Sequence, residues 1–127
     1  MPFTRITLRQ GRAPAFIQDL SSLLQQNLVA WFDVPPGDCF QVIDQVPPES
    51  LVVDRDYICG PRSEDFILLQ IIAGRRRDLD TQRMFYRRLT ETLEQKLHVR
   101  PQDVMIVITL NRPQDWSFGG GAMFAPP

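Results

Sequence analysis

The chain has 127 residues, 43% of them hydrophobic, which is typical of one globular domain with a core of its own. Its 14 Lys and Arg residues nearly balance 15 Asp and Glu residues, so no net field attracts nucleic acid or an anionic membrane. Two cysteines and one histidine lack the spacing of a zinc site, and no apolar run approaches the length of a membrane span. We therefore expect a single cytoplasmic domain over 1–127, without metal or cofactor.

The first half of the chain, about 2–46, predicts a βαβ unit. Short stretches alternate polar and apolar residues, which is typical of strands with one buried face, and between them apolar residues recur at helical spacing. The pattern predicts a strand at 3–9, a helix at 15–32 and a strand at 39–46. Prolines end the helix and follow the second strand.

The second half, about 64–111, predicts another βαβ unit. Its strands, 66–73 and 104–110, are almost wholly apolar, as expected of strands covered on both faces. Between them, leucines and Phe85 recur at four-residue steps and predict a helix at 79–97. The remaining residues, 112–127, form a tail that we expect to fold as a hairpin.

The two halves share features at matching places. Gly11-Arg12 precedes the first predicted helix and Gly74-Arg75 the second, while VPPGD at 34–38 corresponds to VRPQD at 99–103. Two such halves predict an α/β (α+β) fold: a tandem βαβ repeat whose four-stranded mixed sheet carries both helices on one face. The opposite apolar face needs a partner, so we predict an oligomer.

The run GRRRD at 74–78 lies between a predicted strand and a helix, where α/β proteins tend to bind ligands. In an extended backbone, Arg75 and Arg77 point to one side and Arg76 to the other. Two guanidinium groups on one side can bind a carboxylate in bidentate fashion. Taken alone, the run is more simply explained by a solvated basic turn.

Asp38 begins the second predicted strand, and Asp103 holds the same place in the other half. A turn carboxylate used twice for structural reasons explains the pair. A functional Asp38 would orient or activate water, or hold a nearby amine protonated. The repeat does not decide between the two interpretations. His98, at the end of a predicted helix, interacts most simply with the helix dipole and is given no catalytic role.

Aromatic residues gather in the tail, where Trp116 and Phe118 precede three glycines and Phe124 follows them. These side chains either tuck a hairpin onto a neighbouring subunit or line the apolar wall of a small pocket, and both can hold together. At the other end of the chain, Pro2 directly follows Met1. Removal of the initiator methionine would leave Pro2 as a secondary-amine N-terminus.

Together these features resemble the tautomerase superfamily, and specifically its malonate semialdehyde decarboxylase group. They cover the chain from end to end: Pro2, Gly11-Arg12, VPPGD at 34–38, Arg62-Ser63, the arginine run, Phe85-Tyr86, and DWSFG at 115–119. The resemblance implies a homotrimer of βαβ repeats with a freed proline nitrogen at the bottom of each pocket. It also implies that Pro2 is the catalytic amine and Asp38 the catalytic aspartate.

The resemblance aligns the arginine run in two ways. Arg75 and Arg77 match the group's arginine pair if one residue is inserted before Arg75, whereas Gly74 and Arg76 align without that insertion. We take Arg75 and Arg77 as the residues that bind the substrate carboxylate. The implied apolar wall consists of Trp116, Phe118 and Phe124.

The chemistry that the resemblance implies is decarboxylation of a small oxo acid, with hydration as a side activity. A cationic Pro2 would donate to the substrate carbonyl as negative charge develops there. If desolvation and the arginines instead lower the Pro2 pKa below that of an ordinary α-amine, about 8, the nitrogen is a base. The enzyme would then be a keto–enol tautomerase of phenylpyruvate type. A third hypothesis is a catalytically silent trimer that only binds a partner or ligand.

Overall fold

The structure is a computed structural model, and it describes residues 1–126. Three short 3-10 turns, at Pro48–Ser50, Pro101–Asp103 and Pro113–Asp115, lie in the connections and the tail. The main elements are β1 (Pro2–Arg9), α1 (Pro14–Trp31), β2 (Gln41–Val46), β3 (Ile67–Ala73), α2 (Leu79–Leu97) and β4 (Val104–Leu110). All six predicted elements are thus present, within two residues of the predicted bounds.

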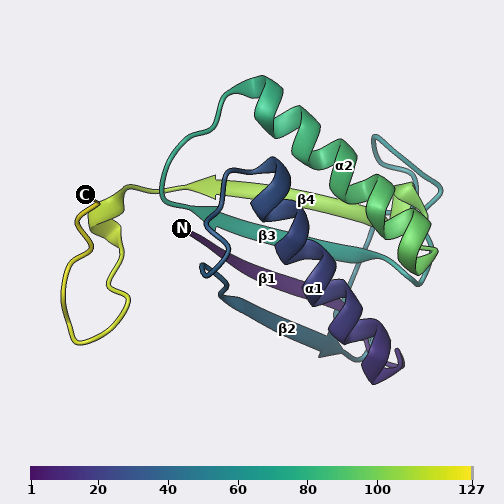
Figure 1. The fold of residues 1–127 in the computed structure, drawn as a ribbon. Helices are drawn as coiled ribbons and strands as arrows, with labels where there is room; N and C mark the ends of the chain where they lie inside the picture. Colours follow the sequence, from purple (N-terminus) through teal and green to yellow (C-terminus); the bar gives the residue numbers. More distant parts are fainter. Residues whose placement is uncertain (127) are drawn as a thin grey trace.

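The four strands form one mixed sheet in the order β2-β1-β3-β4 (Figure 1). β1 pairs parallel with β2, and β3 pairs parallel with β4, so each βαβ half contributes a parallel pair. The two halves meet where β1 runs antiparallel to β3, with Pro2 beside Ala73. The start of β1 and the ends of β3 and β4 therefore share one end of the sheet, beside which the tail also lies.

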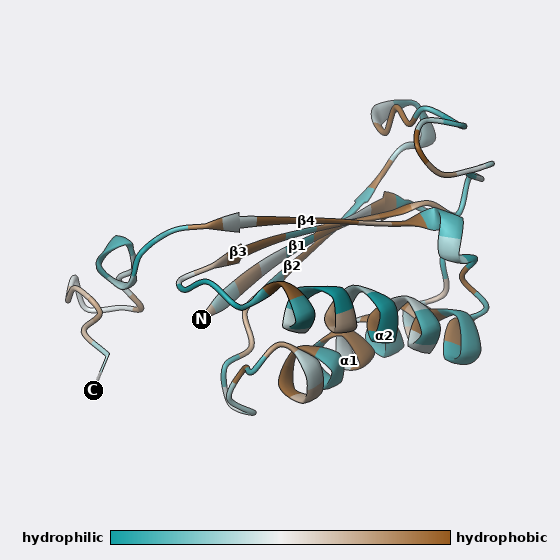
Figure 2. Cartoon of the chain, turned by 90° about the horizontal axis from the view of Figure 1, so that it is seen from above, coloured by the Kyte–Doolittle hydropathy of each residue, from teal (hydrophilic) through white to brown (hydrophobic). Residues whose placement is uncertain are grey.

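Both helices pack on one face of the sheet, as predicted (Figure 2). The core lies between the two layers, and its largest fully buried side chains come from both helices and from β1 and β3. The repeat is visible in this packing, because buried residues recur at one constant spacing: Leu20, Leu24 and Leu28 in α1 correspond to Phe85, Leu89 and Leu93 in α2. Burial of each such side chain contributes roughly 1.5–3 kcal/mol.

Local signals explain where the helices start and stop. Pro14 occupies the first turn of α1, where its missing N–H costs nothing. Asp78 caps α2 by accepting a hydrogen bond from the Thr81 N–H at 2.7 Å. His98 ends α2 in the left-handed conformation, with φ of 57°, and its N–H bonds to the Glu94 carbonyl.

The helix starts correct one detail of the predicted repeat. α1 begins at Pro14 and α2 at Leu79, so Arg12 and Arg77 both lie two residues before a helix. Gly11-Arg12 and Gly74-Arg75 are therefore not equivalent in the structure, although they look alike in sequence. The segments 34–38 and 99–103 do correspond, because they are offset along the chain by the same number of residues as the buried side chains of α1 and α2.

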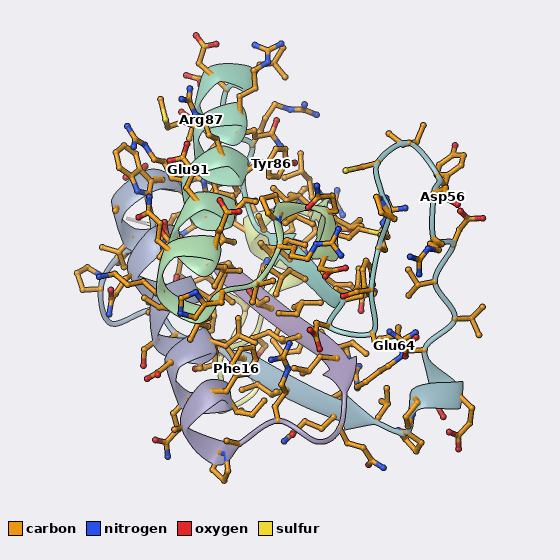
Figure 3. The ribbon with its side chains drawn as sticks, turned by 90° about the vertical axis from the view of Figure 1, so that its right-hand side faces the viewer. Phe16, Asp56, Glu64, Tyr86, Arg87 and Glu91 are labelled. Carbon is orange, nitrogen blue, oxygen red and sulfur yellow. The ribbon has the colours of Figure 1, made fainter. Side chains whose placement is uncertain are left out.

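The face of the sheet opposite the helices is open, and it carries apolar side chains beside an Arg5–Asp44 ion pair. Val42, Met105 and Val107 are exposed there, and β3 adds Leu68 and Ile72. Hence the chain's own helices cover β3 and β4 on one face only, and cover of the other face by a partner stays a prediction. The connection from β2 to β3 projects on this open side (Figure 2), and Figure 3 shows its Asp56 away from α2.

The tail turns back on itself without forming strands. The Phe124 N–H donates to the Trp116 carbonyl at 2.9 Å, and the Ala122 N–H donates to the Gly119 carbonyl. Three successive glycines with positive φ make the reversal between them. The predicted hairpin is therefore a closed loop rather than a strand pair. In the described part of the chain, neither helix is long and apolar enough to cross a membrane.

Candidate active site

The N-terminus lies against Asp38. The Met1 amine is 2.6 Å from Asp38 Oδ2, and the side chains of Met1 and Asp38 are only 13% and 16% exposed. Pro2 is buried at the start of β1, beside Ala73. The terminal amine and the carboxylate thus form an ion pair. The structure therefore places Met1, the residue before Pro2, in contact with Asp38, and the catalytic roles of Pro2 and Asp38 stay predictions.

The turn that follows α1 fixes Asp38 in place. The Asp38 N–H donates to the Pro35 carbonyl at 3.0 Å, and the Asp38 carbonyl accepts from Gln25 Nε2 at 3.0 Å. Both bonds use backbone atoms, so the side-chain carboxylate is directed to the terminus. The prolines of the segment 34–38 therefore end the helix and also position the carboxylate.

Asp103, the counterpart of Asp38 in the repeat, has a different set of partners. Its side chain is fully buried, and its two oxygens accept hydrogen bonds from the Ser63 N–H at 2.7 Å and the Ser63 hydroxyl at 2.6 Å. Each aspartate thus contacts the segment that leads into the first strand of its own half. In the first half the aspartate contacts the Met1 amine. In the second half it contacts the N–H and hydroxyl of Ser63, which lies within the chain.

Gly74 forms a flat surface next to the N-terminus. Its N–H donates to the Met1 carbonyl at 3.1 Å. A Cβ at this position would overlap the Met1 side chain and lie 3.0 Å from Trp116 Nε1. Met1 and the Trp116 indole therefore pack on the same side of Gly74. A side chain larger than hydrogen at residue 74 would displace one of them.

The aromatic residues predicted to line a pocket form a cluster. Trp116 stacks on Phe118 with a centroid separation of 5.4 Å, and Phe118 contacts Phe124 edge-on at 5.2 Å. Phe40, the residue just before β2, joins the cluster at 5.8 Å from Phe118. The cluster lies at the same end of the sheet as Met1 and Asp38. Of the three residues predicted to form an apolar wall, Phe124 lines the cavity that contains Met1, whereas Trp116 and Phe118 do not, so their role as a wall stays a prediction.

Arg75 and Phe124 line a cavity of about 570 Å³ together with Met1. Residues 33–36, Pro113 and Pro126 complete its lining. Arg75 is exposed, and its Nη2 atom donates to the Asp33 carbonyl at 3.0 Å and pairs with the Asp33 carboxylate. The cavity thus combines a cation, an apolar surface and the N-terminal residue.

Arg77 has a different environment from Arg75. It is 6% exposed and donates to the carbonyls of Phe32 at 2.9 Å and Arg75 at 3.0 Å, and its guanidinium lies 4.2 Å from the centre of the Phe32 ring. Desolvation, followed by the charge of Arg75, lowers the pKa of Arg77 to about 10, while Asp33 and Asp38 act in the opposite direction.

The two-arginine clamp predicted from an extended backbone is not formed in this structure. The backbone bends at Gly74 and Arg75, so the strand alternation that would align the two side chains does not apply. Arg75 faces the cavity, whereas Arg77 binds backbone carbonyls and Arg76 is exposed. Direct contact of Arg77 with a substrate therefore stays a prediction, one that requires rearrangement of its hydrogen bonds.

The opposite end of the sheet carries a second cavity, which is lined by two ion pairs. Arg9 pairs with Glu64 at 3.3 Å, and Arg12 pairs with Asp65 at 3.2 Å. These four residues line a cavity of about 530 Å³ with Gln10, Gly11 and Pro48. The two ends of the repeat therefore differ in chemistry despite their shared backbone.

Three site residues were missed by the sequence prediction. Asp33 pairs with Arg75, Gly74 lies under Met1, and Asn111 accepts a hydrogen bond from Trp116 Nε1 at 2.6 Å. Gly74 and Asn111 each directly follow a strand, and polar or small residues at strand ends were the available signal. Asp33 follows the first predicted helix, and nothing in the sequence indicates that it pairs with Arg75.

The comparisons with known proteins agree with this description. The model of the family described as "Tautomerase enzyme" matches residues 38–119. Two proteins of Bacillus subtilis (strain 168) are similar over 95% of this chain. "Probable tautomerase YusQ" is 33% identical and 95% covered, and "Probable tautomerase YrdN" is 29% identical and 93% covered.

Solved structures extend the likeness to three dimensions. Crystal structures of wild-type, mutant and inactivated malonate semialdehyde decarboxylase match with a TM-score of 0.87 and 31% identity, over 94% of this chain and 92% of that chain. The crystal structure of native fused 4-OT matches with a TM-score of 0.78 at 17% identity, over 95% of this chain and 94% of that chain, which shows the fold alone.

The fold and the cavity beside the N-terminus define an enzyme of the tautomerase type, an isomerase or a lyase. The chain belongs to the tautomerase family, and within the superfamily it is similar to the malonate semialdehyde decarboxylase group. The family resemblance predicted from the sequence is thereby confirmed.

Proposed function

We propose that this protein decarboxylates a small 3-oxo acid and that Pro2, freed by removal of Met1, is its catalytic amine. The observation that carries the proposal is the contact of 2.6 Å between the N-terminal amine and Asp38 at the edge of a cavity that Arg75 also lines. The likeness to malonate semialdehyde decarboxylase, whose structures are described in terms of decarboxylase and hydratase activities, supports this reaction class.

The Pro2 nitrogen lies close to Asp38. The Pro2 nitrogen is one residue along the backbone from the Met1 nitrogen, which is 2.6 Å from Asp38 Oδ2. Standard bond lengths therefore put the Pro2 nitrogen within about 6 Å of the same oxygen. Loss of Met1 would remove the group that now pairs with the carboxylate. Asp38 would then favour the protonated form of the secondary amine, as an opposite charge at short range does.

Removal of Met1 would also expose the groups that its backbone and side chain now cover. The Gly74 N–H, which donates to the Met1 carbonyl, would become a donor for a substrate oxygen. The surface of Gly74 and the edge of the Trp116 indole would border the vacated space. The site would then offer donors on one side and an apolar wall on the other, which suits a short oxo acid.

The proposed reaction breaks the bond between the substrate's carboxylate carbon and its α-carbon. The bonding pair enters an enolate as carbon dioxide leaves, and the Pro2 N–H cation donates a hydrogen bond to the oxygen on which charge develops. Transfer of a proton from solvent to the enolate carbon then gives the aldehyde, while Pro2 keeps its own proton. The aromatic cluster disfavours the charged acid relative to the less charged transition state.

Arg75 is the proposed ligand of the substrate carboxylate, since it is the arginine that lines the cavity. Its bonds to Asp33 both use Nη2, which belongs to both bidentate forks of the guanidinium, so Nη1 is left for a single hydrogen bond and a bidentate contact would require Asp33 to release Nη2. Arg77 would act indirectly, without touching the substrate. It donates to the Arg75 carbonyl at 3.0 Å, which helps to position Arg75, and its charge adds to the positive potential of the site. A direct role for Arg77 in binding is the other arrangement that the resemblance implies.

The second candidate function is keto–enol tautomerisation with Pro2 as a base. The observation that favours it is the description of both bacterial relatives as probable tautomerases. Burial of Pro2 and the charge of Arg75 act against protonation of the amine, whereas Asp38 acts for it. The balance of these effects decides which reaction the amine performs.

We also propose that the protein is a homotrimer, in which the open face of each sheet is covered. The exposed side chains of Val42, Met105 and Val107 supply an apolar surface for association. A fused 4-OT of the same fold, 15% identical, is described as a symmetric trimer. The partner of each chain would thus be two further copies of itself.

Parallel assays with 3-oxopropanoate and with the enol of phenylpyruvate test the proposed reaction. We expect carbon dioxide release from the first at a rate far above the uncatalysed one. Turnover of the enol alone would transfer the function to the tautomerase alternative. Turnover of neither, by a trimer that still binds small carboxylates, would support a binding protein without catalysis and contradict both enzymatic proposals.

A further inference from the structure

Asn111 joins the end of β4 to the aromatic cluster. Its N–H donates to the Ala73 carbonyl at 2.9 Å, which extends the pairing of β3 with β4 by one residue. Its side-chain oxygen accepts the Trp116 Nε1–H at 2.6 Å. The amide is therefore fixed on the sheet, and the indole is fixed on the amide.

The six residues from Asn111 to Trp116 form a turn that brings the indole back to the sheet. Asp115 accepts hydrogen bonds from the Arg112 N–H at 2.9 Å and from the Arg112 guanidinium at 3.2 Å. The hydrogen bond from the Arg112 guanidinium is the main reason that the pKa of Asp115 is below its ordinary value. The turn is thus closed by its own ion pair, independently of Asn111.

Two contacts hold the Trp116 ring, and they restrict different motions. Stacking on Phe118, with an angle of 18° between the rings, fixes the plane of the indole but lets it slide and rotate within that plane. The hydrogen bond to Asn111 fixes the direction of the Nε1 edge. That edge is the part of the ring that would lie 3.0 Å from a Cβ on Gly74.

We infer that Asn111 is a positioning residue that holds the Trp116 indole against Gly74 and thereby limits the size of the acid that reaches Pro2. This inference rests on the proposed function. Met1 and the indole share the surface of Gly74, so the indole edge borders the space that removal of Met1 would vacate. Without its acceptor the indole can rotate away, and the space beside the amine widens.

Comparison of Asn111→Leu with Asn111→Asp tests the inference, because leucine keeps the size of the side chain and aspartate keeps the acceptor oxygen. The readout is the ratio of kcat/KM for 3-oxopropanoate to kcat/KM for 3-oxobutanoate, which carries one extra methyl group. We expect Asn111→Leu to lower this ratio about tenfold, in line with the value of one hydrogen bond and one methyl group. We expect Asn111→Asp to keep the ratio within about twofold of wild type.

A double-mutant cycle separates positioning from a general structural role. In a Trp116→Phe background, which removes the indole donor, Asn111→Leu should change the ratio no further. An equal change in both backgrounds would overturn the inference, as would an unchanged ratio in Asn111→Leu alone. Gln114→Leu, at an exposed amide in the same turn, is the matched control and should keep the wild-type ratio.

A second readout needs no turnover and distinguishes failure of this inference from failure of the proposed function. Hydrogen exchange of the two Trp indole N–H groups is measured by NMR, with Trp31→Phe to assign the Trp116 signal. We expect exchange at Trp116 to accelerate about tenfold in Asn111→Leu and to stay near wild type in Asn111→Asp. If wild type decarboxylates neither acid, the proposed function fails. Separately, if the Trp116 indole N–H exchanges at the same rate in Asn111→Leu and Asn111→Asp, the positioning role of Asn111 is overturned.

Discussion

The N-terminal amine of Met1 lies 2.6 Å from Asp38 Oδ2, while Asp103, which holds the equivalent place in the repeat, binds the N–H and hydroxyl of Ser63. One turn geometry therefore serves two purposes in the same chain. Where the chain terminates, the carboxylate faces an amine at a cavity. Where the chain continues, the carboxylate is fully buried and stabilises a loop.

This difference predicts opposite effects for two matched substitutions. Asp38→Ala should reduce turnover by about 10²- to 10³-fold while changing the free energy of unfolding by less than about 1 kcal/mol, since its carboxylate is partly exposed. Asp103→Ala should lower the free energy of unfolding by about 2–4 kcal/mol, because buried donors of Ser63 lose their acceptor. Denaturant unfolding and steady-state kinetics measure the two quantities. A pattern with the roles reversed would contradict the assignment.

The arginine run predicts a different result for each of its members. Arg75→Ala should raise KM for 3-oxopropanoate about tenfold or more, because a charge-assisted hydrogen bond to the carboxylate is lost. Arg76→Ala, at an exposed position outside the cavity lining, is the control and should change KM less than about twofold. An effect of Arg76→Ala that exceeds the effect of Arg75→Ala would favour the alignment in which Gly74 and Arg76 match the arginine pair.

Arg77 completes this prediction through stability. Arg77→Met keeps much of the side-chain volume but removes donors to the Phe32 and Arg75 carbonyls, which are held at 2.9 and 3.0 Å. The free energy of unfolding should fall by about 2 kcal/mol. Unchanged stability together with a large rise in KM would show instead that Arg77 binds the substrate itself.

The open face of the sheet predicts the behaviour of two methionines with similar exposure. Met105 lies on the open face and is 46% exposed, whereas Met84 lies on α2 and is 38% exposed. In a trimer that covers the open face, Met105→Glu should bury a charge and dissociate the assembly, and Met84→Glu should not. Light scattering coupled to size-exclusion chromatography distinguishes the two. A wild-type monomer, or a trimer that tolerates Met105→Glu, would contradict the proposed interface.

A buried hydroxyl in β1 predicts a gain in stability. Within residues 1–126, Thr4 Oγ1 is buried without a hydrogen-bond partner, and Thr4 is 1% exposed. Thr4→Val replaces the hydroxyl by a methyl group of nearly the same size and should raise the free energy of unfolding by about 1 kcal/mol. Loss of stability in this variant would show that the hydroxyl has a partner, such as a buried water molecule.

Periodicity predicted the elements well because each helix and strand buries a regular set of apolar residues. α2 and β4 have the predicted bounds, since their patterns end at clear signals such as His98 and Leu110. The predicted strand at 39–46 is shorter in the structure: β2 begins at Gln41, and the ring of the preceding Phe40 packs on Phe118. Long-range packing of this kind leaves no periodic trace in a sequence.

The candidate site was predictable in part. The family resemblance identified Pro2 and Asp38, and the structure brings this end of the chain together with Arg75 and the aromatic cluster. The bend at Gly74 was not predicted, because alternation within a short arginine run assumes an extended backbone. Partners that come from distant elements, such as Asp33 for Arg75 and Asn111 for Trp116, depend on tertiary structure alone.

The most direct test of the central proposal is a comparison of wild type with Pro2→Ala, after intact mass has shown that Met1 is absent from both. The primary amine of Pro2→Ala keeps a terminal nitrogen but lacks the pyrrolidine ring, so its position and pKa change. We predict that kcat/KM for 3-oxopropanoate falls by about 10²- to 10³-fold, the usual contribution of a positioned proton donor. Undiminished turnover by Pro2→Ala would contradict the proposal that the N-terminal proline performs the chemistry.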